Sequence, residues 1–165
     1  MKHHLLLAAT AILLLASCSG RGKVQNLAQE SLKHSVYEPS ALQVEAISEP
    51  DSAFGTNYFT KGELKGMLGI MKTVTDTIMH RTHDMTLFNP DDYYVIGLAD
   101  RQMQASSQLR DMLFTAGRKG PWTGWKVKVD YWAKDHNGQP YHAERWVFTD
   151  KEGEQVLHTF DLPLP

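Results

Sequence analysis

Disulfide bonds, a membrane-spanning run and a strong charge of one sign are all missing from this sequence. Its 165 residues include one cysteine, Cys18, so no intramolecular disulfide can form. Acidic and basic residues number 19 and 17, without a long block of either sign, which gives no electrostatic support for nucleic-acid binding. The apolar run over residues 5–16 is shorter than the roughly 20 residues that cross a bilayer. We therefore expect a domain that depends on its hydrophobic core and has no nucleic-acid partner.

The apolar run has the order of parts found in a signal peptide. Lys2 precedes it, and small residues and then Cys18 follow it. The segment Leu15-Ala16-Ser17-Cys18 resembles the lipobox of bacterial lipoproteins. That resemblance implies removal of residues 1–17 and attachment of acyl chains, such as palmitate, at Cys18. A secretory signal peptide followed by a chance cysteine is the alternative.

Removal of the signal peptide would leave enough chain for one domain. The remaining 148 residues carry 16 basic and 19 acidic side chains, a formal charge of −3. We expect residues 18–23 to form a short polar tether and residues 24–165 to form a single domain. Ser19 resembles the residue that directs lipoproteins to the outer membrane, and no acidic run of the surface-export kind follows Cys18. The expected location is the outer membrane, facing the periplasm.

The spacing of apolar residues predicts three amphipathic helices, over residues 24–36, over residues 61–86 and from Asn89 to Gly117. Asn89 is expected to be the N-cap of the third helix, and Gly117 to be the first residue past its end. The two longer helices should pack as a hairpin. Residues 42–48 alternate as in a strand, and residues 54–59 form either a short strand or an aromatic loop.

The C-terminal third predicts a three-stranded antiparallel meander over residues 124–161. Asn137-Gly138 is a strong signal for a two-residue hairpin loop, because both positions accept positive φ. Counting from that loop places Val129 opposite Trp146.

A second turn over residues 150–153, closed between Asp150 and Glu154, would place Trp146 opposite His158. The expected fold class is therefore α+β: a single domain in which amphipathic helices cover the apolar face of the meander.

Two pairs of side chains could carry chemistry. His80 and His83, with Asp76 and Asp84 nearby, could offer two or three metal ligands from one helical face, although a metal site needs further ligands. Glu144 and His158 project to one face of the meander, where a carboxylate beside an imidazole could do acid–base work. In both cases a structural role, a solvated helix end or a packed ring, is the favoured interpretation. We expect no catalytic residue, no metal and no cofactor.

The four tryptophans suggest carbohydrate or peptide stacking, although Trp146 is expected in the core. Trp132, with Val147 and Leu157, could form an apolar patch on the face of the sheet opposite Trp146. Such a patch would be a binding surface or the underside of another helix.

A family resemblance rests on the lipobox, on Tyr37-Glu38-Pro39-Ser40 and on the stretch from Gly124 to Phe148. Together they resemble small lipoproteins of Gram-negative anaerobes whose function is unassigned. The resemblance implies no catalytic residues. The helix-plus-meander layout also looks like cystatin-like and nuclear-transport-factor-like folds, which carry little functional weight by themselves.

The expected function is a non-catalytic binding or structural role in the bacterial envelope, with the membrane as one partner through the lipid anchor. A protein, peptide or glycan would be the second partner. A small-molecule-binding domain with a pocket between sheet and helices is the alternative. An envelope enzyme that uses one of the two residue pairs is the third possibility.

Replacement of the single cysteine tests the anchor. The Cys18→Ala variant should lose acyl-chain labelling and should be released from the membrane, because no thiol remains to be acylated. Membrane fractionation after growth with labelled palmitate measures both effects. Label and membrane retention in the variant would contradict the lipobox interpretation.

Overall fold

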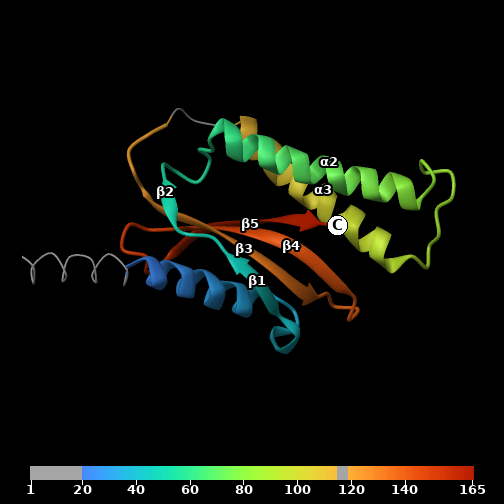
Figure 1. The fold of residues 1–165 in the computed structure, drawn as a ribbon, viewed down its shortest axis with the longest axis horizontal. Helices are drawn as coiled ribbons and strands as arrows, with labels where there is room; N and C mark the ends of the chain where they lie inside the picture. Colours follow the sequence, from blue (N-terminus) through green and yellow to red (C-terminus); the bar gives the residue numbers. More distant parts are fainter. Residues whose placement is uncertain (1–19, 115–118) are drawn as a thin grey trace, which may run out of the picture.

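A computed structural model describes residues 20–114 and 119–165, with side chains up to residue 112 in the first range (Figure 1). The predicted signal peptide, Cys18 and Gly117 lie outside these residues. Within them, three helices pack on one five-stranded antiparallel sheet. The N-terminal helix covers residues 20–35, and the other elements are a short 3₁₀ helix at Pro39–Ala41, β1 (Gln43–Ile47), β2 (Asp51–Ala53), α2 (Lys61–Arg81), α3 (Tyr93–Phe114), β3 (Gly124–Lys134), β4 (Pro140–Thr149) and β5 (Val156–Leu164).

The sheet is larger than the predicted meander. Its order is β1-β3-β4-β5, and β2 pairs with β3 beside β1. The strand predicted over residues 42–48 is β1, and the segment 54–59 is a loop rather than a strand. No helix in the described part of the chain is long and apolar enough to cross a membrane.

Helices cover both faces of the sheet. In Figure 1 the N-terminal helix lies below the strands, whereas α2 and α3 lie above them. The lower core joins Val24, Ala28 and Leu32 to Val127, Val129 and Val147, among others. The upper core joins Met67 and Met71 of α2 and Leu109 of α3 to Trp146, Phe148 and Phe160. The expectation of a single covered face was therefore incomplete.

The loop between β3 and β4 has three residues rather than two. The backbone N–H of Asp135 donates to Gln139 O at 3.0 Å, and Gly138 takes a φ of 76°. The Asp135 carboxylate accepts hydrogen bonds from the N–H groups of Asn137 and Gln139, which stabilises this longer loop. A three-residue loop with a left-handed glycine is the next most common hairpin connection.

The extra loop residue shifts the register by one and moves every β4 side chain to the other face. Val129 lies opposite Arg145, and Trp146 lies opposite Lys128. The predicted pairing of Val129 with Trp146 was wrong for this reason.

The second turn forms as predicted and includes Gly153, which has a left-handed φ of 65°. Its closure lies one residue later than predicted, since the Asp150 N–H donates to Gln155 O at 3.0 Å. Backbone N–H groups, that of Glu154 first, donate to the Asp150 carboxylate and lower its pKa. A bulge between Phe148 and Thr149 shifts the register by one further residue, so that His158 faces Phe148 instead of Trp146.

The helical hairpin is confirmed, with its ends shifted. Thr60 and Glu63 form a capping box at the start of α2. This helix ends at Arg81, and the following residues His83–Met85 have left-handed backbones. Asp92, not Asn89, caps α3, because its carboxylate accepts the Val95 N–H at 3.2 Å.

Helical structure already covers residues 20–23, which were predicted to belong to the tether. Lys23 forms an ion pair of 2.7 Å with Glu154 in the second turn.

The close approach at Gly124 gives a stability prediction. A Cβ at this position would lie 1.9 Å from Thr149 O, and the φ of 155° disfavours any side chain. We expect Gly124→Ala to lower the free energy of unfolding by about 2 kcal/mol or more. The matched control is Gly69→Ala in α2, where nothing lies within 4 Å. The control should raise the free energy by about 0.5–1 kcal/mol. Urea unfolding measures both, and equal effects would contradict the assigned register.

Candidate functional site

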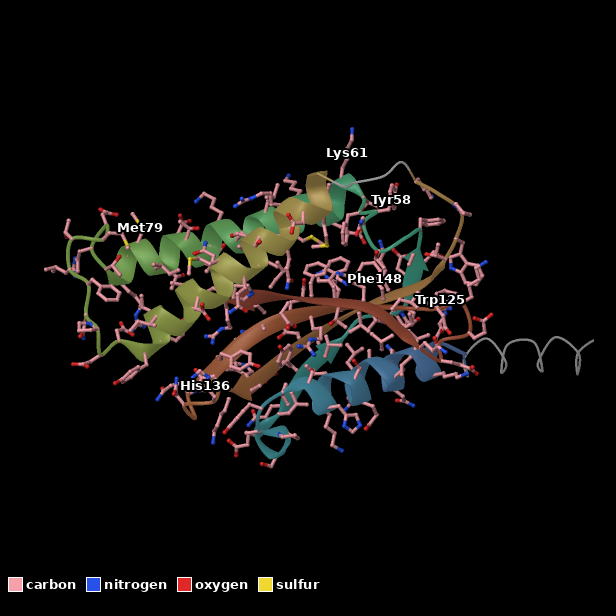
Figure 2. All side chains as sticks on the ribbon, turned by 180° about the vertical axis from the view of Figure 1, so that it is seen from behind. Tyr58, Lys61, Met79, Trp125, His136 and Phe148 are labelled. Carbon is pink, nitrogen blue, oxygen red and sulfur yellow. The ribbon has the colours of Figure 1, made fainter. Side chains whose placement is uncertain are left out.

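A cavity of about 700 Å³ lies where α3, the loop between β3 and β4, and β5 meet the end of the N-terminal helix. Its volume falls within the usual range for small-molecule sites. His136 of the loop lies at the end of the molecule opposite Trp125 (Figure 2). The side chains that matter for the argument are Ser35, Arg101, Tyr131, Tyr141, Phe160 and Asp161.

One wall of the cavity is a bidentate ion pair. Arg145 Nε donates to Asp161 Oδ1 at 2.7 Å, and Nη2 donates to Oδ2 at 2.6 Å. Arg145 Nη1 also donates to the Ser35 hydroxyl, and the Tyr131 hydroxyl donates to Asp161 at 3.2 Å. Burial alone would lower the pKa of Arg145, but the hydrogen bonds and charge of Asp161 outweigh burial and raise it. The buried charge of Arg145 is therefore fully paired and hydrogen-bonded.

Arg101 of α3 is a second arginine at the cavity and, unlike Arg145, has no carboxylate partner among the described residues. Its guanidinium lies over the Tyr141 ring, 4.6 Å from the centroid. Its Nε is buried without a hydrogen-bond partner, and no ion pair of Arg101 occurs within the described residues. Burial lowers the pKa of Arg101, although the surrounding acidic groups oppose this. The cavity thus contains a partly buried cation that packs on an aromatic ring and has a buried Nε without a partner.

The backbone of α3 makes room for this arginine. Gly97 precedes Arg101 by one helical turn, and a Cβ there would lie 3.2 Å from Arg101 Nη1. The guanidinium can therefore fold back against the helix.

Tyrosine side chains give the cavity an amphipathic lining. Tyr131 and Tyr141 meet edge to face with centroids 6.0 Å apart. Burial raises the pKa of both phenols, so both hydroxyls stay protonated at neutral pH. Tyr37, Tyr93 and Ile96 are exposed at the rim. A ligand here would meet aromatic surface beside the cations Arg101 and Lys134, with the carboxylates of Asp100 and Asp135 also in the lining.

The structure does not bring Glu144 and His158 together. His158 lies opposite Phe148, four residues along β4 from Glu144, which corresponds to about 13 Å. Glu144 accepts the Trp146 indole N–H at 2.8 Å, and the His158 ring packs beside Phe148 and Phe160. Neither side chain lines the cavity.

His80 and His83 do not share a helical face. α2 ends between them, and His83 has a left-handed backbone with φ of 46°. In residues 20–114 and 119–165, no group of three or more His, Cys, Asp or Glu side chains could hold a metal ion.

The predicted Trp132 patch does not form. Because of the register shift, Trp132 lies on the same face as Trp146, stacked on His142 with ring centroids 4.4 Å apart. Val147 is buried in the opposite core instead, and Leu157 is exposed on β5.

A smaller hollow beneath the start of α2 contains a buried lysine. Lys126 is 3% exposed and contacts Glu63 at 2.5 Å. Burial raises the pKa of Glu63, but hydrogen bonds from Lys126 and Thr60 outweigh it, so the pKa is lowered overall. Since Glu63 also completes the capping box of α2, we interpret this pair as a structural clamp between helix and sheet.

The sequence pattern did not point to Arg101, Arg145 or Asp161 as site residues. One signal was present: Gly97 four residues before Arg101 leaves space on a helix face. Arg145 and Asp161 stand in otherwise apolar strands, where a charge needs a partner.

Comparison of the chain with protein-family models, with curated proteins and with solved structures finds no match. Functional inference therefore depends on the geometry of the cavity and on the sequence motifs.

The Glu63–Lys126 pair predicts a pH dependence of stability. The pKa of Glu63 is lower in the folded state than in the unfolded state. The ion pair therefore stabilises the fold fully at a pH above the pKa of Glu63 in the unfolded state. This stabilisation is lost as the pH falls through the pKa of Glu63 in the folded state. Glu63→Gln should cost about 3 kcal/mol at neutral pH, because the buried Lys126 would keep only the exposed carboxylate of Asp51, 3.9 Å away. The difference from the unmodified protein should shrink below about pH 4.

Urea unfolding between neutral and acidic pH measures this difference. Glu45→Gln, at an exposed position of β1, is the control and should show almost no difference at any pH. A Glu63→Gln effect that does not change with pH would contradict the ion pair.

Proposed function

We propose that this chain is a lipid-anchored envelope protein whose domain binds a small organic anion in the Arg101 cavity, without chemistry on the ligand. The anchor is supported by the lipobox that ends at Cys18. The binding role is supported by one observation above the others: Arg101 is a partly buried cation, inside a cavity of ligand size, with a fully buried Nε that has no partner.

A ligand carboxylate would supply what Arg101 lacks. A buried charge is costly unless it is paired and hydrogen-bonded, and a guanidinium pairs best with a planar, bidentate acceptor. Asp161 cannot serve, because both of its oxygens are held by Arg145. An incoming anion would therefore gain an ion pair that the protein itself does not form.

The rest of the ligand would be apolar or aromatic. The Tyr131 and Tyr141 rings and Phe160 line the interior, and the protonated Tyr141 hydroxyl can donate to a polar atom of a ligand. Pockets with apolar walls and a few fixed polar groups are typical small-molecule sites. This geometry favours a small-molecule site over the protein, peptide or glycan surface expected at Trp132, whose apolar neighbours face elsewhere.

Substitution of Arg101 tests the binding role. The lipidated protein is purified from its own envelope and examined by native mass spectrometry for a retained anionic molecule. We expect Arg101→Met to lose that molecule, because the guanidinium is its ion partner. The aliphatic part of the side chain is kept, so the free energy of unfolding should be unchanged or higher once the buried charge is gone.

Arg110→Met is the matched control, since Arg110 is an exposed arginine of the same helix. The control should retain the ligand. Equal retention in both variants, or the absence of any retained anion in the unmodified protein, would contradict the proposed function.

A further inference from the structure

The end of the molecule opposite the cavity carries a cluster of aromatic rings. Trp122 and Trp125 meet edge to face with centroids 5.4 Å apart, and Trp122 is 38% exposed. Phe54 lies beside them, because the Thr123 N–H donates to Ala53 O at 2.9 Å and the Thr123 hydroxyl accepts the Gly55 N–H. We call Phe54, Trp122 and Trp125 the aromatic pole.

Two lysines cover the rings of the aromatic pole. Lys151 Nζ lies 5.4 Å from the Trp122 ring centroid, and Lys119 Nζ lies 4.1 Å from that of Phe54. Trp122 is exposed, and Trp125 is partly buried against the lower core. A Trp ring at the surface beside Lys is typical of the interface between lipid headgroups and acyl chains, where one end of the side chain is apolar and the other is wet.

A chain of contacts connects the aromatic pole to the first described turn of the N-terminal helix. The Trp125 indole N–H donates to Lys151 O at 3.0 Å. Two residues on in the same turn, Gly153 packs so closely on Val24 that a Cβ would lie 2.8 Å from its methyl group. Lys23 also pairs with Glu154. The aromatic pole therefore lies at the same end of the molecule as residue 20, where the N-terminal helix begins. Figure 2 shows Trp125 at this end.

The distance along the chain from the anchor is short. Cys18 precedes residue 20 by two positions, and two residues span at most about 7 Å. From residue 20 onward the chain is helical and packed on the sheet. An acylated Cys18 would hold this end of the domain at the membrane surface.

We propose that the aromatic pole rests in the lipid interface of the membrane to which Cys18 is anchored, so that Trp122 and Trp125 are a second membrane contact. This inference depends on the proposed lipid anchor. Acidic Glu152 and Glu154 stand in the same turn as Lys151, so the contact comes from ring insertion rather than from net charge. Added salt should therefore leave it unchanged.

Quenching of tryptophan fluorescence by brominated lipids tests the orientation. The full-length lipidated protein is reconstituted in vesicles of phosphatidylethanolamine and phosphatidylglycerol, with and without bromine on the acyl chains. We expect quenching of the unmodified protein, and loss of most of it in the double variant Trp122→Phe with Trp125→Phe. The single variant Trp122→Phe, at an exposed position, should lose part of the quenching. It replaces the double variant in the test if the double variant does not fold.

Trp132→Phe is the matched control, because Trp132 is 36% exposed and lies on the same strand, seven residues or about 23 Å from Trp125. The control should keep the quenching. The mass of the acylated N-terminal peptide is measured in the same samples. Acylated protein without quenching, or quenching that disappears with Trp132→Phe instead, overturns the inference and leaves the anchor standing. Protein without acyl chains overturns the anchor and the inference together.

Discussion

The closure of the loop between β3 and β4 determines where nearly every side chain of the sheet lies. Asp135 holds that loop at three residues by accepting two backbone N–H groups. The resulting register sends Val127 and Val147 to the N-terminal helix and sends Trp146 to α2 and α3. A register one residue away would send the side chains of β4 to the opposite faces relative to β3, and would separate Val127 from Val147.

The amino-acid sequence predicted the elements far better than their register. Apolar periodicity located the N-terminal helix, the helical hairpin and the C-terminal strands, because each buries one regular stripe. The β3–β4 register was predicted wrongly because both faces of these strands are apolar, so either register brings apolar residues together. The cavity residues were not predicted from the sequence either, since the partners of Arg145 are Ser35 and Asp161, on elements far apart in sequence.

The two arginines near the cavity differ in how their buried charge is stabilised. Arg145 is paired with a carboxylate, bonded to a hydroxyl and fixed in place, so it stiffens the wall. Arg101 rests on a ring and keeps an unsatisfied Nε, an arrangement that costs stability unless something else pairs with it. Proteins retain such costs mainly where binding or catalysis requires them. The contrast is the physical reason for placing ligand recognition at Arg101 and structural support at Arg145.

The cavity and the aromatic pole lie at opposite ends of the N-terminal helix, and this separation bears on the nature of the ligand. Residues 20–35 of an α-helix span about 22 Å, and Ser35 at the far end touches the cavity wall. With the aromatic pole in the lipid interface, the cavity would open roughly a helix length above the headgroups. A bilayer lipid could not reach Arg101 without leaving the membrane. On the proposed anchor and binding role, the anion that fits this geometry would be a water-soluble one that arrives from the aqueous side of the membrane, with its carboxylate at Arg101 and its apolar part among the tyrosines.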